Sequence, residues 1–338
     1  MQQDTLVEIN DLKQYFAIEK GIFNRKVGEI KAVNGVSLKI KQRETLGLVG
    51  ESGCGKSTLG RAVLRLQEPT AGDIYFNQED EKVSVLELNN RDMRKVRANM
   101  QMIFQDPFSS LNERMTVMDN IIEPLVVNNI GDKASRKKRA GDLLEQVGLR
   151  REYLSRYPHS FSGGQRQRVG IARALSIKPQ FIVADEPVSA LDVSVQAQIL
   201  NLLKKLQKEM DLTFLFISHD LGVIRYVSDR IAVMYMGNIV EIGEREELLR
   251  NPYHPYTEAL LSAVPRPGQR RNRIVLEGST PDPINLPSGC IFRTRCPYAE
   301  KKCAEQKPEW ENVEGEHFAA CHFKDSLELK GIKNRKRA

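Results

Sequence analysis

The segment at residues 50–57 restricts the fold of this 338-residue chain more than any other. It reads Gly-Glu-Ser-Gly-Cys-Gly-Lys-Ser and fits the pattern G-x-x-x-x-G-K-S in full. The apolar run at 45–49 predicts a strand directly before it, and residues 58–66 predict a helix directly after it. In that setting the N–H groups of the loop turn inward around phosphate oxygens, and the helix N-terminus adds a partial positive charge. The sequence therefore predicts a nucleotide-binding loop in an α/β domain.

The side chains and glycines of this loop have distinct expected tasks. Lys56 is expected to reach the β- and γ-phosphates of a nucleotide, and the Ser57 hydroxyl to bind Mg²⁺. The glycines allow the backbone to approach the phosphates closely. The predicted nucleotide-binding residues here are Gly50, Gly53, Gly55, Lys56, Ser57 and Thr58.

A second acidic site is predicted after the apolar run at 181–184, which ends in Asp185 and Glu186. A buried parallel strand places its last side chains at the carboxyl edge of the sheet, where ligands bind. We expect Asp185 to hold Mg²⁺ and Glu186 to polarise the water that attacks the γ-phosphate. The alternative is that both acids only cap the next turn, and the phosphate loop in the same chain argues against it.

Strand and helix signals alternate through the middle of the chain. Helices are predicted at 165–176, 193–210 and 222–228, and strands at 181–184 and 213–217. This alternation is typical of βαβ units around a parallel sheet.

Composition and charge argue against several other classes of protein. Apolar residues make up 41% of the chain and charged residues 28%, as in a globular protein. The longest apolar runs fall far short of the ~18 residues of a membrane span. The first ten residues lack the pattern of a secretory signal. The net charge is +7, and five basic residues with no acid among them lie in the last nine positions of the tail, 330–338. We interpret this tail as solvated and predict no nucleic-acid partner, with an anionic lipid surface as the alternative.

Residues 161–168 read Phe-Ser-Gly-Gly-Gln-Arg-Gln-Arg and resemble the signature motif of the ATP-binding-cassette (ABC) family. The glycine pair opens a predicted helix, which makes a second anion site. The resemblance implies that this segment closes over the ATP held by a second subunit, so that two cassettes work as a dimer. Its implied nucleotide contacts are Ser162, Gly163, Gly164 and Gln165.

The other motifs of the ABC family follow in order. Gln105 matches the glutamine that senses Mg²⁺ and the attacking water, and His219 matches the histidine that contacts the γ-phosphate. The resemblance therefore implies an ATPase with Glu186, His219 and Gln105 as catalytic residues. The implied Mg²⁺ ligands are Ser57, Gln105 and Asp185.

Two further positions complete the implied ATP site. Asp192 closes the run Ser-Ala-Leu-Asp at 189–192, which resembles the loop that communicates between two cassettes. Phe16 matches the aromatic residue that stacks on adenine, and the adjacent Tyr15 is the alternative.

The C-terminal third is similar to that of oligopeptide and dipeptide importer ATPases, at 251–257 and across the cysteine-rich segment 289–321. Residues 170–175, 187–190 and 231–241 look like the second, F-type, ATPase subunit of such importers. The resemblance implies that ATP hydrolysis powers peptide import. Alternatives are a related importer for nickel chelates, glutathione or oligosaccharides, or a non-transport ABC ATPase.

The partners and location follow from the same resemblance. It implies a D-type ATPase subunit as heterodimer partner, two transmembrane permease subunits and an extracytoplasmic peptide-binding protein. The chain would then lie at the cytoplasmic face of the cell membrane as a peripheral subunit. The run at 106–112 is the expected coupling surface toward the permease.

The implied fold is an ABC nucleotide-binding domain at 5–250, with a phosphate-loop RecA-like core and an antiparallel β subdomain. A helical subdomain is expected at about 107–165. A cysteine-rich C-terminal extension is expected at 251–325, followed by the basic tail at 326–338.

Four cysteines gather in the extension: Cys290, Cys296, Cys303 and Cys321. Clustered thiols in an intracellular chain favour metal ligation over disulfides. Their gaps are wider than those typical of structural zinc, so the spacing leaves an iron–sulfur cluster, zinc and metal-free thiols open. Transporters of this family with the same cysteine pattern carry a 4Fe–4S cluster. The resemblance therefore implies such a cluster, with Zn²⁺ as the alternative, as a staple for a loop-rich segment.

Overall fold

The loop at 50–57 joins a buried strand to a helix, as expected, in a computed structural model that describes residues 5–20, 25–78, 81–264 and 273–332. The end of the predicted basic tail (333–338) and part of the predicted extension (265–272) lie outside the described residues. The chain forms two compact units. The first comprises residues up to Leu6, Ile40–Thr45 and Phe76–Ile217, and the second comprises Val7–Lys39, Leu46–Tyr75 and the chain from Ser218 onward.

Parallel strands form the centre of the first unit. Their order is β8-β7-β6, formed by Thr213–Ser218, Phe181–Asp185 and Met100–Ile103. Phe181 lies opposite both Met100 and Thr213, and all residues of β7 and β8 are buried. Burial on both faces explains why these strands are continuous apolar runs. The predicted parallel βαβ arrangement is confirmed for these strands.

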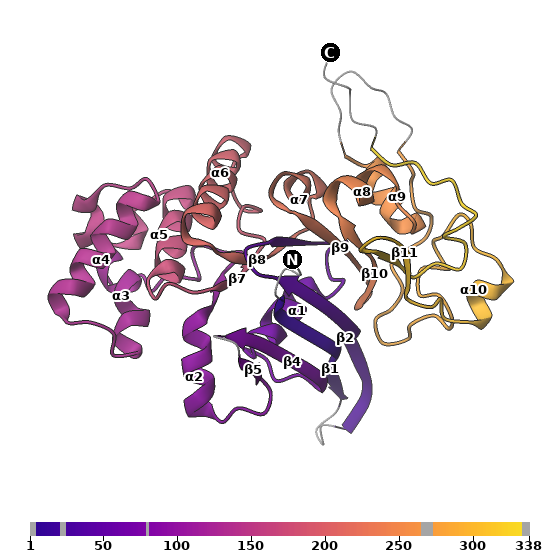
Figure 1. Ribbon diagram of the computed structural model, residues 1–338, viewed down its shortest axis with the longest axis horizontal. Coiled ribbons are helices and arrows are strands. Elements are labelled where there is room, and N and C mark those ends of the chain that lie inside the picture. The colour runs from indigo at the N-terminus through magenta and orange to yellow at the C-terminus, as the bar shows by residue number, and fades with distance from the viewer. Residues whose placement is uncertain (1–4, 21–24, 79–80, 265–272, 333–338) are drawn as a thin grey trace, which may run out of the picture. The chain divides into compact units, whose positions relative to one another are not determined.

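Helices make up most of the rest of the first unit. They are α2 (Asn90–Asn99), α3 (Val117–Val127), α4 (Lys133–Gln146), α5 (Gly163–Leu175) and α6 (Val193–Met210), with short 3₁₀ turns at Arg151–Ser155 and Pro158–Ser160. Figure 1 shows α3, α4 and α5 side by side, and each of them contacts the other two. Asp132 begins α4 with a capping box, its side chain accepting from the Ser135 N–H.

The second unit contains a five-stranded sheet segment and the phosphate loop. The strand order is β11-β12-β10-β9-β3, formed by Glu311–Glu314, His317–Ala319, Asn238–Glu244, Arg230–Tyr235 and Thr45–Val49. Strand β3 pairs parallel with β9, and the remaining pairs are antiparallel. Met236 and Gly237 both have positive φ in the tight turn between β9 and β10, as such hairpins require.

Strand β12 adds part of the predicted C-terminal extension to this sheet. Its Ala319 lies opposite Glu241 of β10, and the His317 ring contacts the Glu241 carboxylate, Nε2 to Oε1, at 2.8 Å. Both side chains are almost fully buried, at 2% and 0% exposed. The sequence reasoning placed no strand in this region, so β11 and β12 are additions to the predicted fold.

The other strands of the described residues form a four-stranded sheet of order β2-β1-β4-β5. They are Arg25–Lys41, Thr5–Lys20, Ala71–Gln78 and Glu81–Ser84. The helices of the second unit are α1 (Lys56–Val63), α7 (Leu221–Val227), α8 (Arg245–Arg250), α9 (Pro255–Ser262) and α10 (Lys301–Glu305). Figure 1 shows α8 beside β9 and β10, which it contacts. Across the described residues, no helix is both long enough and apolar enough to cross a membrane.

Candidate nucleotide-binding site

The phosphate loop surrounds the ammonium group of its own lysine. Lys56, at the start of α1, is 4% exposed, and its Nζ donates to the carbonyl oxygens of Gly50 and Glu51, both at 2.9 Å. The same Nζ lies 3.8 Å from the Cys54 Sγ. Burial raises the pKa of the Cys54 thiol, and Lys56 opposes the shift only in part. The loop therefore holds one buried ammonium group beside a neutral thiol, which suits an anionic ligand.

Close backbone contacts explain two of the predicted glycines. A Cβ on Gly55, whose φ is +105°, would lie 1.9 Å from the Ala32 carbonyl oxygen. A Cβ on Gly50 would lie 2.2 Å from the Met234 carbonyl oxygen. Backbone atoms cannot move aside as a flexible side chain can, so both positions require glycine. Around Gly53, by contrast, no described atom lies within 4 Å of an added Cβ.

Two predicted catalytic residues, Gln105 and Glu186, and the predicted Mg²⁺ ligand Asp185 belong to the first unit. Gln105 follows β6, and its Nε2 donates to Glu186 Oε2 at 3.1 Å. Asp185 is the last residue of β7 and is 1% exposed. Glu186 takes a left-handed backbone with φ of 45°, which a glutamate adopts at a cost of roughly 1–2 kcal/mol. Its N–H donates to the Ile217 carbonyl oxygen at 3.0 Å, which fixes this turn. The carboxyl edge of β7 thus brings an amide and two carboxylates together.

The signature segment forms the N-terminus of α5. Ser162 is the N-cap, and its Oγ accepts from the Gln165 N–H while the Gln165 Oε1 accepts from the Ser162 N–H. A Cβ on Gly164 would lie 2.4 Å from Val195 Cγ1, so this glycine also permits close packing of α5 on α6. An added Cβ on Gly163 would make only ordinary contacts, the nearest at 3.5 Å.

Three of the remaining predicted residues, Phe16, Asp192 and His219, are exposed, whereas Ser57 and Thr58 are partly buried. Asp192 is the N-cap position of α6, and His219 follows β8. Phe16 on β1 is 37% exposed, whereas the neighbouring Tyr15 donates its hydroxyl to Asn34 Oδ1 at 2.6 Å. The hydrogen bond holds the Tyr15 side chain in place, whereas the exposed Phe16 ring makes no such bond. Phe16, His219 and all predicted residues of the phosphate loop, including Lys56, Ser57 and Thr58, belong to the second unit, and the other predicted ATP-site residues belong to the first.

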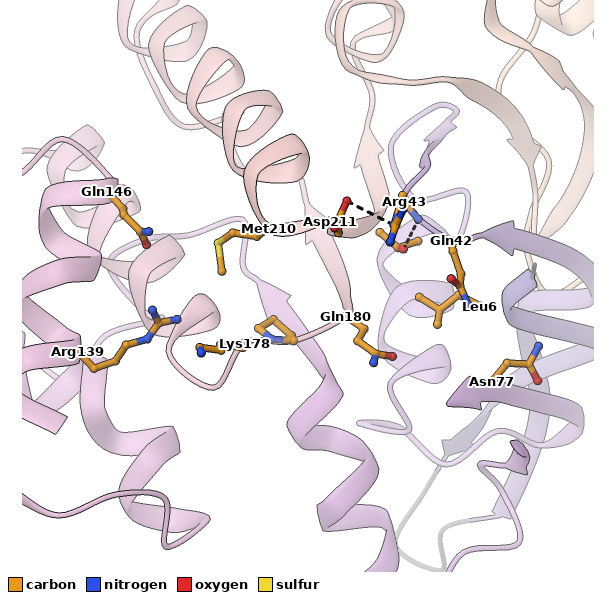
Figure 2. A pocket seen from close by; sticks show the side chains of 12 residues that line it. Leu6, Gln42, Arg43, Asn77, Arg139, Gln146, Lys178, Gln180, Met210 and Asp211 are labelled. Atoms are coloured by element: carbon orange, nitrogen blue, oxygen red, sulfur yellow. Dashed lines mark hydrogen bonds and ion pairs between the residues drawn. The ribbon is translucent and has the colours of Figure 1, made fainter. Parts of the chain in front are cut away.

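A cavity in the first unit lies away from these residues. It has a volume of about 510 Å³ and includes Lys178 and Gln180, which precede β7, and Asp211, which precedes β8. Figure 2 shows Arg43 paired with Asp211 at this cavity, with Arg139 and Lys178 farther along it. Asp185 ends β7 and Glu186 follows it, at the end of the strand opposite to the cavity, so the cavity is not the candidate catalytic site.

The four predicted metal-binding thiols are free and lie within each other's electrostatic influence. Burial raises the pKa of Cys296 to about 12 and that of Cys321 to about 11, and other cysteines of the set add to both shifts. The Cys290 N–H donates to the Cys303 carbonyl oxygen at 2.8 Å. Yet among the described residues no three His, Cys, Asp or Glu side chains are placed to hold a metal ion. The geometry therefore does not support the predicted iron–sulfur cluster.

Sequence reasoning missed the partners of Glu51 in the phosphate loop. Its carboxylate pairs with Arg295, and its N–H donates to the Tyr256 hydroxyl oxygen at 2.8 Å. Glu51 occupies a variable position of the loop motif, so the motif itself gave no signal for these contacts.

Comparison with known proteins agrees with the geometry. Residues 33–189 match the family model described as ABC transporter, and residues 240–303 match the oligopeptide/dipeptide transporter C-terminal region. The oligopeptide transport ATP-binding protein AppF of Bacillus subtilis is 54% identical over 95% of this chain and 98% of its own. The oligopeptide transport ATP-binding protein OppF of Salmonella typhimurium is 49% identical over 96% of this chain and 98% of its own.

Solved structures extend the likeness to three dimensions. A dimeric bacterial ABC transporter cassette matches with a TM-score of 0.62 and 30% identity, over 71% of this chain and 99% of that one. A post-hydrolysis dimer of an ATP-binding cassette with ADP and Pi matches with a TM-score of 0.61, at the same identity and coverage. The α/β cassette fold is confirmed, and the chain is an ATPase for which ATP and Mg²⁺ are the expected ligands. It belongs to the ABC family, among the ATP-binding subunits of oligopeptide and dipeptide transporters.

Proposed function

We propose that this chain hydrolyses ATP to drive the import of oligopeptides or dipeptides through a membrane permease. The observation that carries this proposal is the 54% identity, over 95% of the chain, to an oligopeptide transport ATP-binding protein. The match of residues 240–303 to the oligopeptide/dipeptide transporter C-terminal region supports the same substrate class.

The proposed chemistry assigns Glu186 as the base that polarises the attacking water. Gln105, at 3.1 Å from Glu186, orients that carboxylate. Lys56 binds the β- and γ-phosphates from within the loop, and His219 contacts the γ-phosphate. Phe16 stacks on the adenine.

Ser57, Gln105 and Asp185 would hold Mg²⁺, which neutralises charge on the phosphate oxygens when bound. The remaining nucleotide contacts are Gly50, Gly53, Gly55 and Thr58 in the loop, and Ser162, Gly163, Gly164, Gln165 and Asp192 toward a partner cassette.

Two variants test the site. Glu186→Gln should lower ATP turnover by ~10²-fold or more while ATP affinity stays near that of the wild type, because it removes the base and keeps the shape. Lys56→Ala should weaken ATP binding itself. Glu209→Gln, which changes an exposed acid late in α6, serves as the control. Near-normal turnover of Glu186→Gln would remove Glu186 from its proposed role.

The proposed assembly pairs this chain with a second ATPase subunit of D-type, two transmembrane permease subunits and an extracytoplasmic peptide-binding protein. The chain would act at the cytoplasmic face of the cell membrane. The run at 106–112 suits a coupling surface, because its Phe108 is a large apolar side chain that is 51% exposed, next to Phe104 at 40% exposed. Phe108→Ser should lower transport more than ATPase activity, and equal losses would contradict the coupling role.

A transport assay tests the substrate class. A strain lacking this chain should lose uptake of di- and oligopeptides, and the wild-type chain but not Glu186→Gln should restore it. Unchanged peptide uptake with loss of nickel-chelate, glutathione or oligosaccharide uptake would overturn the peptide proposal.

The domain organisation is also proposed. Residues 5–250 form the nucleotide-binding domain with a helical subdomain at about 107–165, and 251–325 form the extension, followed by the tail at 326–338. Helices α3 and α4 within 107–165 support the helical subdomain. The match at 240–303 supports a distinct extension.

For the extension we propose a 4Fe–4S cluster on Cys290, Cys296, Cys303 and Cys321. The mutual electrostatic influence of the four thiols supports a shared ligand. Metal binding deprotonates thiols, so a cluster would relieve the raised pKa values of Cys290, Cys296 and Cys321. Anaerobic purification should give iron and sulfide in matching amounts with absorbance near ~400 nm. Zinc without iron would favour the Zn²⁺ alternative, and the absence of both metals would overturn metal binding.

A further inference from the structure

Arg295 of the C-terminal extension forms an ion pair with Glu51 of the phosphate loop. Arg295 Nη1 lies 2.7 Å from Glu51 Oε2, and Arg295 Nη2 lies 3.1 Å from Glu51 Oε1. Two parallel N–H···O bonds of this kind fix orientation as well as distance. The side chains of Arg295 and Glu51 are only 9% and 30% exposed, so water screens this pair weakly. The pair therefore differs from the many exposed ion pairs that contribute little.

Aromatic packing holds both partners in place. Tyr235, Tyr256 and Phe292 pack together with ring centroids 4.7–5.4 Å apart. The Tyr256 hydroxyl accepts the Glu51 N–H, and the Arg295 N–H donates to the Phe292 carbonyl oxygen at 3.0 Å. All three rings are fully buried, so the extension presents Arg295 to Glu51 from a rigid base. The hydrogen bonds to Glu51 raise the pKa of Arg295, and burial opposes the shift.

The charge of Glu51 is a problem for a loop that binds phosphate. Its carbonyl oxygen lies 2.9 Å from Lys56 Nζ, so Glu51 belongs to the same turn as the cation that attracts the nucleotide. An uncompensated carboxylate at this position repels phosphate oxygens and competes for Lys56. Arg295 removes both effects, because it pairs with both oxygens of that carboxylate.

We propose that the C-terminal extension is part of the nucleotide site, and that Arg295 is a positioning residue that compensates Glu51 and keeps the phosphate loop in its anion-binding form. This inference rests on the proposed role of the loop in ATP binding. It adds a residue that lies outside every motif of the cassette, 244 positions from its partner in the chain.

Nucleotide binding by the full chain tests the proposal. The probe is the non-hydrolysable analogue AMP-PNP with Mg²⁺, measured by calorimetry. Arg295→Gln should raise the dissociation constant on the order of tenfold, the effect of one close uncompensated charge. Arg295→Lys keeps the charge but loses the two parallel hydrogen bonds, so its dissociation constant should lie between those of the wild type and Arg295→Gln. Arg293→Gln is the matched control, since Arg293 bonds Ser288 in the same loop.

A charge-removal rescue separates compensation from mere structural support. Adding Glu51→Gln to Arg295→Gln removes the uncompensated carboxylate and should bring affinity back to within about threefold of the wild type. Wild-type affinity in Arg295→Gln, or a double variant as weak as Arg295→Gln, would overturn the proposal. If Arg295→Gln does not fold, Arg295→Lys carries the same test, and wild-type affinity there counts against the proposal.

Lys56→Ala distinguishes a failure of the proposed role of Arg295 from a failure of the loop as the nucleotide site. Loss of AMP-PNP binding in Lys56→Ala together with unchanged binding in Arg295→Gln would refute the role of Arg295 and leave the proposed function intact. Unchanged binding in Lys56→Ala would refute the loop as the nucleotide site, and the inference would fall with it.

Discussion

Replacing His317 with leucine should loosen the outer strands of the second unit from β10. Glu241 of β10 is fully buried, and its carboxylate accepts from the N–H groups of Tyr253 at 2.8 Å and His254 at 3.0 Å. The third donor is His317 Nε2 at 2.8 Å. In His317→Leu the carboxylate stays buried with one donor fewer, and the edge-on contact with the Tyr253 ring, 4.8 Å between centroids, is lost.

The expected loss follows from those two contacts. A hydrogen bond to a charged group contributes about 1.5–3 kcal/mol, and an edge-on aromatic pair about 0.5–1.5 kcal/mol. We therefore expect the free energy of unfolding of this region to fall by about 2–4 kcal/mol. With a typical urea dependence, that corresponds to a midpoint lower by on the order of 1 M.

A single tryptophan makes this region visible. Trp310 is the only tryptophan of the chain, and its ring stacks on Phe318, next to His317, at 6.0 Å between centroids. Its fluorescence in a urea titration therefore reports on these strands. His317→Gln is the control, because its amide N–H can replace the ring donor and should recover more than half of the midpoint. An unchanged midpoint in His317→Leu would show that this pair does not hold the extension to β10.

Three further outcomes are expected. Gly55→Ala should weaken nucleotide binding at least about tenfold in calorimetry, because its Cβ would lie 1.9 Å from the Ala32 carbonyl oxygen; wild-type affinity would contradict the loop geometry. Gly164→Ala should lower the free energy of unfolding by about 1–3 kcal/mol, because the added Cβ overlaps Val195. Adding Val195→Ala should restore it if that overlap is the cause. Burial lowers the pKa of His254 from about 6.5 to about 3. Between these two pH values the imidazole is protonated in the unfolded chain but not in the folded one. Stability should therefore fall as pH drops from about 6.5 toward 3, and His254→Asn should reduce that slope by about 1 kcal/mol per pH unit in urea titrations at several pH values. An identical slope in both proteins would contradict the buried neutral histidine.

The parts of the fold with strong local signals could be predicted. The phosphate loop has its motif, its strand and its helix within residues 45–66, so no distant contact is needed to recognise it. Strand β7 is a continuous apolar run because it is buried on both faces. The sequence also placed Gln105 and Glu186 in one site, and the structure puts their side chains within hydrogen-bond distance.

The missed parts depend on contacts between distant segments. Strand β11 reads Glu-Asn-Val-Glu, which has no strand pattern of its own, and it is extended only because it pairs with β12. The Arg295–Glu51 pair joins residues 244 positions apart, and neither residue belongs to a periodic pattern. Gly164 was read as a nucleotide contact alone, because its close approach to Val195 exists only once α5 and α6 have packed.

The pairing of β12 with β10 bears on how the nucleotide-binding domain avoids aggregation. A chain ending at residue 250 would leave β10 as an edge strand with a row of N–H and C=O groups open to pairing with other chains. The extension covers that edge and ends the sheet in β11, a short strand whose Glu311 and Glu314 disfavour the approach of another strand. The pairing of β12 thus protects the edge of β10, and we expect a chain cut at residue 250 to aggregate more readily than the full chain.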